Sequence, residues 1–217
     1  MPRGFPVVLL ALSLFALLPT SRAVDPPPDG GYPNGNTAEG ENALFSLTGG
    51  TFNTATGYRA LFSDTTGSNN TAIGTSALCN NTTGEMNTAT GVAALYSNTA
   101  GQENTANGYG ALQSNTTGSA NVAIGFFALE ENTTGGANVA IGIAALENNT
   151  TGSHNSACGT GALQDNTTGN FNTSSGFAAR LLTRRAAITR PKVFMRFVAT
   201  QPASTTRPTV LMHSLAI

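Results

Sequence analysis

Residues 121–137 read NVAIGFFALEENTTGGA, and residues 138–154 repeat the pattern as NVAIGIAALENNTTGSH. The same 17-residue period runs through most of the chain, and each unit opens with Asn and has Gly four residues later. Many columns held in register over nine units identify a repeat protein. The opening residues are Asn36, Asn53, Asn70, Asn87, Asn104, Asn121, Asn138, Asn155 and Asn172.

The consensus unit is N-T-A-x-G-x-x-A-L-x-x-N-T-T-G-x-x, with residues numbered below as positions 1 to 17. A helical-hairpin repeat needs about 33 residues, and two Gly per unit would weaken every helix. A coil of two short extended segments and two tight turns fits this length, with the Gly residues in the turns, where φ can be positive. Parallel strand hydrogen bonds would stack the coils about 4.8 Å apart. The sequence therefore predicts an all-β fold, a parallel β-solenoid of 17-residue coils over residues 36–180.

Column composition predicts which side chains point inward. Position 3 is nearly always Ala, and positions 8 and 9 supply an Ala-Leu pair, so the expected core is thin. The Asn residues at positions 1 and 12 are expected to form ladders of stacked amide hydrogen bonds. A narrow rod of this kind is marginal alone, and large apolar residues at positions 4 and 6 would be half-exposed. Their burial between chains predicts an oligomer. They are Ile73, Val92, Tyr109, Ile124, Phe126, Ile141 and Ile143.

Residues 1–23 have the composition of a signal peptide. Arg3 precedes an apolar run over residues 7–18, and small residues flank the expected cleavage point after Ala23. The run is shorter than the roughly 20 residues that a bilayer requires, which disfavours a membrane anchor. Residues 24–35 form a linker rich in Pro and Gly. We therefore expect a secreted or bacterial cell-surface protein with no membrane span in its mature chain.

The tail, residues 181–217, differs in composition from the repeats. Seven of the ten Lys and Arg residues occur from Arg180 onward, with no acid among them. A basic interaction tail and a disordered end are two interpretations. The third is an out-of-frame continuation of the repeat, because Thr189-Arg190-Pro191 recurs 17 residues later as Thr206-Arg207-Pro208. In a neighbouring frame, residues 183–192 back-translate to NTTGSHNTAK, and the consensus continues beyond them.

Catalytic and metal-binding patterns are missing from the sequence. His occurs only at His154 and His213, and no Ser/His/Asp set, HExxH or CxxC is present. Cys79 and Cys158 lie four coils or more apart, about 19 Å by strand spacing, beyond disulfide reach. One Arg against nine acids in residues 36–179 disfavours nucleic-acid binding. We expect no enzymatic activity, no catalytic, cofactor-binding or metal site, no cofactor and no nucleic-acid partner.

Three units carry a motif that resembles a known family. Asn70-Thr71-Ala72-Ile73-Gly74, Asn121-Val122-Ala123-Ile124-Gly125 and Asn138-Val139-Ala140-Ile141-Gly142 resemble the head repeat of trimeric autotransporter (YadA-like) adhesins. The resemblance, over about residues 36–179, implies a left-handed parallel β-roll, a homotrimer and an extracellular-matrix or glycan ligand. The chain also resembles N-T-A-x-G-x-x-A-L repeat proteins of bacterial surfaces and tail fibres. Its unit is a few residues longer than the usual head repeat, and no coiled-coil stalk or anchor barrel is recognisable after it.

Two functions of different class follow from the repeat. The first is a structural or adhesive module that binds through many weak copies of one surface. The alternative is an ice-binding solenoid that uses ladders of Thr. It would need a flat array, whereas these residues precede a turn glycine. They are Thr65, Thr82, Thr99, Thr116, Thr133, Thr150 and Thr167 at position 13, with Thr66, Thr83, Thr117, Thr134, Thr151 and Thr168 beside them.

The out-of-frame interpretation of the tail predicts the loss of one nucleotide near codons 180–182. Sequencing the genomic locus should show a frame that, once restored, continues the 17-residue repeat through the tail. An intact frame with no repeat downstream would contradict the interpretation.

Overall fold

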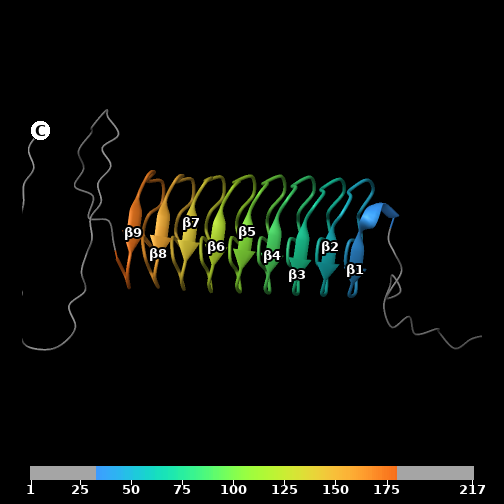
Figure 1. Ribbon diagram of the computed structural model, residues 1–217, viewed down its shortest axis with the longest axis horizontal. Coiled ribbons are helices and arrows are strands. Elements are labelled where there is room, and N and C mark those ends of the chain that lie inside the picture. The colour runs from blue at the N-terminus through green and yellow to red at the C-terminus, as the bar shows by residue number, and fades with distance from the viewer. Residues whose placement is uncertain (1–32, 180–217) are drawn as a thin grey trace, which may run out of the picture.

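The computed structural model describes residues 33–179, and their strands form a single parallel sheet. Nine strands of three residues lie side by side in chain order (Figure 1). The register advances by 17 residues per coil, so that Ala72 lies opposite Ala89. The predicted all-β parallel β-solenoid is therefore confirmed. The strands are β1 (Thr37–Glu39), β2 (Thr54–Thr56), β3 (Thr71–Ile73), β4 (Thr88–Thr90), β5 (Thr105–Asn107), β6 (Val122–Ile124), β7 (Val139–Ile141), β8 (Ser156–Cys158) and β9 (Thr173–Ser175).

The predicted signal peptide, the tail and most of the linker lie outside the described residues. The last three linker residues form a 3₁₀ turn, η2 (Pro33–Gly35), at the start of the rod. The carbonyl of Asn34 accepts a hydrogen bond from the backbone N–H of Phe52 at 3.0 Å. The carbonyl of Pro33 accepts one from Nδ2 of Asn36 at 2.8 Å. The turn therefore accepts hydrogen bonds from donors of the first coil, which has no preceding coil to accept them.

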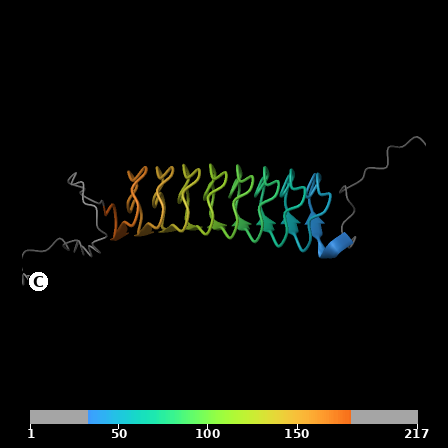
Figure 2. The ribbon, with the colours of Figure 1, turned by 90° about the horizontal axis from the view of Figure 1, so that it is seen from above.

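The coils make a straight rod with one flat side. Figure 1 shows the strands side by side along the rod, and Figure 2 shows them in one layer at its edge. Each coil has one strand rather than the two extended segments expected from the sequence. The return side is still bonded from coil to coil, for example from the N–H of Leu78 to the carbonyl of Ala94 at 3.0 Å. The handedness implied by the family resemblance stays a prediction.

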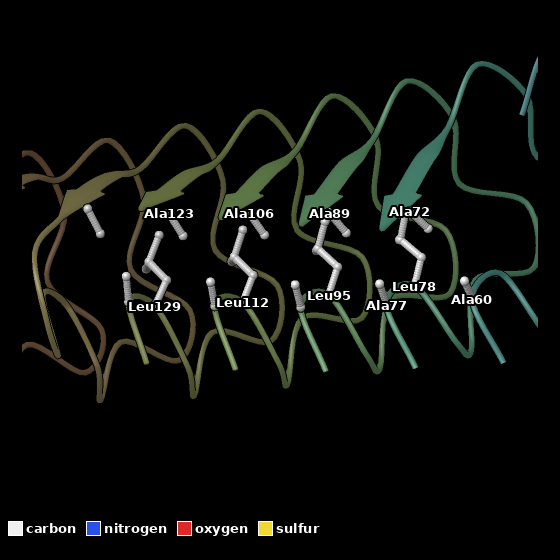
Figure 3. Close-up of a cluster of buried hydrophobic side chains, with 14 of the residues drawn as sticks. Ala60, Ala72, Ala77, Leu78, Ala89, Leu95, Ala106, Leu112, Ala123 and Leu129 are labelled. Atoms are coloured by element: carbon white, nitrogen blue, oxygen red, sulfur yellow. The ribbon is translucent and has the colours of Figure 1, made fainter. Parts of the chain in front are cut away.

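A thin apolar core runs along the rod. The middle residue of each strand from β1 to β8 is a buried Ala, and the Ala-Leu pairs at positions 8 and 9 are buried opposite it. Leu78, Leu95 and Leu112 form a row with one leucine per coil, between strand alanines and alanines of the return side (Figure 3). Full burial of such a leucine stabilises the fold by about 1.5–3 kcal/mol. The predicted inward positions are confirmed.

Two ladders of buried asparagine run beside this core, as the sequence predicts. At position 1, the backbone N–H of Asn87 donates to Oδ1 of Asn70 at 3.0 Å. At position 12, Nδ2 of Asn98 donates to Oδ1 of Asn81 at 2.8 Å. Both ladders also reach the glycine carbonyl at position 15, since Gly101 accepts from Asn87 at 2.8 Å and from Asn98 at 3.0 Å. Each coil is thus closed by two amide groups that meet at one carbonyl oxygen.

Both glycine columns approach the backbone of the next coil closely, and only the column at position 5 also has a positive φ. At position 5, φ lies between 124° and 142°, as expected for a turn glycine. The expectation of a positive φ at position 15 was wrong, because none of these glycines has one. A Cβ at Gly101 would instead lie 2.4 Å from Oδ1 of Asn98 and 2.4 Å from the carbonyl oxygen of Gly118. Close contact between coils, not the dihedral angle, excludes larger residues there.

Residues other than glycine adopt left-handed conformations at positions 7, 9 and 17 of the coils. The leucine at position 9 has φ between 50° and 55° in every coil. A left-handed residue with a Cβ costs about 1–2 kcal/mol, which burial of the leucine offsets. Sequence gives a hint at position 7, where Asn42, Gly110 and Gly161 occur, but none at position 9.

Gly101→Ala should destabilise the rod by about 1–3 kcal/mol, because the added Cβ overlaps backbone and amide atoms. The neighbouring Ala100 is exposed, and its replacement by the consensus Thr should change stability by less than about 0.5 kcal/mol. Thermal unfolding of the full chain, followed by circular dichroism, compares the two variants. Equal midpoints would contradict the packing explanation for position 15.

Candidate functional site on the sheet face

The flat side of the rod carries the outward side chains of the strands, and we call it the sheet face. Each strand comprises positions 2 to 4 of its coil. The side chains at positions 2 and 4 are more exposed, and the side chain at position 3 is buried, as in β3 and β6. Position 6, just beyond the turn glycine, follows on from this face. Because all coils share one register, equivalent side chains recur at the coil spacing of about 4.8 Å.

Six consecutive coils each have a large apolar residue at position 4 or position 6, which together we call the apolar stripe. Two of these coils are apolar at both positions, and the other four have Thr56, Thr75, Thr90 or Asn107 at one of them. Its side chains are between 41% and 54% exposed, which confirms the half-exposed state predicted for Ile73, Ile124 and their equivalents. A contiguous exposed apolar patch on a folded protein is typical of an interaction surface. The apolar stripe comprises Tyr58, Ile73, Val92, Tyr109, Ile124, Phe126, Ile141 and Ile143.

Aromatic side chains in the stripe hold one another in place. The rings of Tyr109 and Phe126 stack across neighbouring coils, with centroids 5.3 Å apart and planes 15° apart. Phe127 contacts both, with its centroid 5.4 Å from Tyr109 and 4.2 Å from Phe126. Side chains that are already ordered lose less conformational entropy when a partner binds. Binding of a partner to this part of the stripe therefore costs less conformational entropy.

Polar residues bound the stripe at both ends. Glu39 and Glu41 are exposed in the first coil, and Cys158 and Thr160 are exposed after the last apolar pair.

Cys158 and Cys79 are both free thiols. Burial raises the pKa of Cys79, whereas the charge of Arg59 lowers it. The effect of burial is the larger of the two, so the pKa of the Cys79 thiol lies above its ordinary value.

The column at position 10 changes character along the rod. Phe45 and Phe62 stack with centroids 5.3 Å apart, and the guanidinium of Arg59 lies 4.3 Å above the ring of Phe62. Four coils after Phe62, the same column holds Glu130, and the next coil holds Glu147. Burial raises the pKa of Glu130, and the nearby charges of Glu147 and Glu131 raise it further. Aromatic residues thus occur in the first coils of this column, and two acidic residues occur towards its other end.

The threonine columns of the ice-binding alternative lie together on one edge, but half of their hydroxyls are used internally. Oγ1 of Thr82 donates to the carbonyl of Thr99 at 2.9 Å, and the other position 13 threonines from Thr48 to Thr150 bond likewise. Position 14 remains as a single exposed row, interrupted by Ala100. The hydroxyls at position 13 therefore stabilise the stack of coils.

Residues 33–179 contain one histidine, two cysteines and nine acidic residues. No group of three or more His, Cys, Asp or Glu side chains is placed there to hold a metal ion. Within the same residues, no helix is long and apolar enough to cross a bilayer. The exposed His154 stacks on Phe171 with centroids 4.9 Å apart. The apolar stripe is thus the most distinctive surface of the described chain.

No family model, no curated protein and no solved structure matches this chain. Evidence on function therefore comes from the geometry of the sheet face and from the repeat motif.

Proposed function

We propose that this chain is a secreted or cell-surface module with a structural and adhesive role, which binds through the repeated surface of its β-solenoid. The observation that carries the proposal is the apolar stripe, whose side chains are 41–54% exposed on a flat, regular sheet. A monomer rarely leaves such a stripe uncovered. The rod form and the absence of a catalytic constellation in the sequence favour a binding role over an enzymatic one.

Self-association is the first use that we propose for the stripe. A second copy has the same coil spacing, so its side chains can pack level with those of the first along the whole stripe. A rotation axis parallel to the rod would place each coil beside its own equivalent. The apolar pairs Ile124 and Phe126, and Ile141 and Ile143, would lie at the centre of that contact. We propose three copies in the assembly, because the repeat resembles that of trimeric adhesin heads.

The surfaces that remain outside such an assembly are suited to weak, repeated binding. The exposed row at position 14 and the neighbouring position 16 present mostly Thr, Ser, Gln and Asn, as in Thr83, Gln102 and Asn170, and Glu85 is the charged residue among them. Uncharged hydrogen-bonding groups of this kind fit an extracellular-matrix or glycan ligand. Several weak contacts in one assembly raise apparent affinity by about 10²–10⁴. The ice-binding alternative has less support, because the position 13 hydroxyls already have acceptors within the rod.

The full chain should have three times its monomer mass in solution, measured by light scattering. Replacing Ile124, Phe126, Ile141 and Ile143 together by Thr should yield a folded monomer, because the apolar contact is lost. As a control, Thr83→Ala with Thr117→Ala, at exposed positions outside the apolar stripe, should leave the mass unchanged. A monomeric wild-type chain, or a stripe variant that stays trimeric with an unchanged circular dichroism spectrum, would contradict the proposed interface.

The adhesive role predicts binding of the wild-type chain to immobilised collagen, immobilised fibronectin or a glycan array. The monomeric stripe variant should bind the same surface about 10²-fold more weakly, because it lacks linked copies. A folded trimer that binds none of these surfaces would contradict the adhesive role while leaving self-association intact. Thermal hysteresis in the same preparation would instead support ice binding.

A further inference from the structure

Asp64 is the buried ionisable residue of the second asparagine ladder. It occupies position 12, where the later coils have Asn and the first coil has Leu47. Its side chain is buried together with the ladder amides. In the described part of the chain, its Oδ2 is the buried side-chain oxygen that has no hydrogen-bond partner. An unpaired buried oxygen in an otherwise satisfied ladder calls for a chemical reason.

The two carboxyl oxygens of Asp64 take the places of the two polar atoms of an amide. Oδ1 accepts from Nδ2 of Asn81 at 2.9 Å and from the N–H of Gly67 at 3.2 Å. In the next coil, Oδ1 of Asn81 accepts from Asn98 in the same way. Oδ2 therefore stands where Asn81 has Nδ2, and that nitrogen donates to the carbonyl of Gly84 at 3.0 Å.

The neighbours of Oδ2 provide one acceptor. In a central coil, Nδ2 of Asn98 donates both to Oδ1 of Asn81 and to the carbonyl of Gly101. The coil before Asp64 has Leu47 at position 12, so it offers no amide oxygen as an acceptor. The glycine carbonyl at position 15 is the acceptor that remains. A neutral carboxylic acid has one O–H donor, whereas an amide has two N–H donors and a carboxylate has none. The neutral acid is the form that leaves no group unpaired here.

We propose that Asp64 is a neutral carboxylic acid in the folded rod, and that its proton holds the first two coils closed by bonding Oδ2 to the carbonyl of Gly67. Loss of this proton places a negative charge in a buried site that faces a carbonyl oxygen. The first two coils, residues 36–69, then open more readily. The N-terminal end of the rod is thus more firmly closed in acid than at neutral pH.

The electrostatics of the site agree with this arrangement. Burial raises the pKa of Asp64 from 3.8 to about 6, although the hydrogen bonds from Asn81 and Gly67 lower it. The side chains that face it from the adjacent coils, Leu47 and Asn81, do not titrate, and no charged group contributes to its pKa. Because the folded pKa lies above the unfolded one, the stabilisation is complete below pH 3.8 and is lost as pH rises through about 6.

Hydrogen exchange of the full chain, followed by mass spectrometry between pH 4 and pH 8, tests the proposal. After correction for intrinsic rates, the opening of coils 1 and 2 should increase roughly fiftyfold between pH 4 and pH 7, because the folded pKa lies about 2 above the unfolded one and the unfolded carboxyl is already partly ionised at pH 4. In Asp64→Asn, coils 1 and 2 should open more than in wild type at pH 4, since one N–H of the new amide lacks an acceptor. At pH 8 they should open less than in wild type, because the variant has no buried charge. Adding Leu47→Asn should protect both coils at both pH values.

The exposed Asp165 supplies a matched control, and Asp165→Asn should leave the pH dependence unchanged. The same pH dependence in Asp64→Asn, or none in wild type, would overturn the proposal. If Asp64→Asn fails to fold, the carboxyl carbon resonances of isotopically labelled wild-type chain give a direct readout. A resonance that titrates near pH 6 supports the proposal, and titration of every aspartate near pH 4 overturns it.

Discussion

The rest of the rod depends on two hydrogen bonds that asparagine side chains donate to the same glycine carbonyl, at position 15 of each coil. In one coil, Asn87 and Asn98 come from opposite ends of the unit and meet at Gly101. The same asparagines bond to the coil before, so one set of amides both closes each coil and fixes its position on the next. The 17-residue register follows, and with it the level alignment of side chains on the sheet face.

Much of this arrangement was predictable from the sequence, because a repeated column reports a repeated environment. The inward alanines, the Ala-Leu pairs and both asparagine ladders were read from column identity alone. The left-handed leucine, such as Leu78, gives no local sign, since its conformation is imposed by packing from other coils. The role of Gly101 was misjudged for a related reason. Turn rules describe a residue's own dihedral angles, whereas here the decisive distance joins two different coils.

The interior and the surface of the rod vary independently. Positions that point inward are nearly constant, whereas the sheet face changes from Glu39 at one end through Thr56 to Ile124 and Ile141. Backbone and ladder bonds therefore hold the shape whatever the outward residues are. Function in such a fold resides in the pattern of outward residues and not in the architecture itself. Asp64 is the exception, because there a change in the interior alters how one end of the rod behaves.

The stacking of the coils in series also determines how the molecule would respond to force. The first and last strands lie at opposite ends of the rod, so tension between its ends acts along the stack (Figure 1). Each coil contacts its immediate neighbours, so coils would peel away one after another from an end. A released coil would change from about 4.8 Å of rod to nearly 60 Å of extended chain. A rod pulled from its ends would therefore lengthen by about tenfold as its coils unfold one after another.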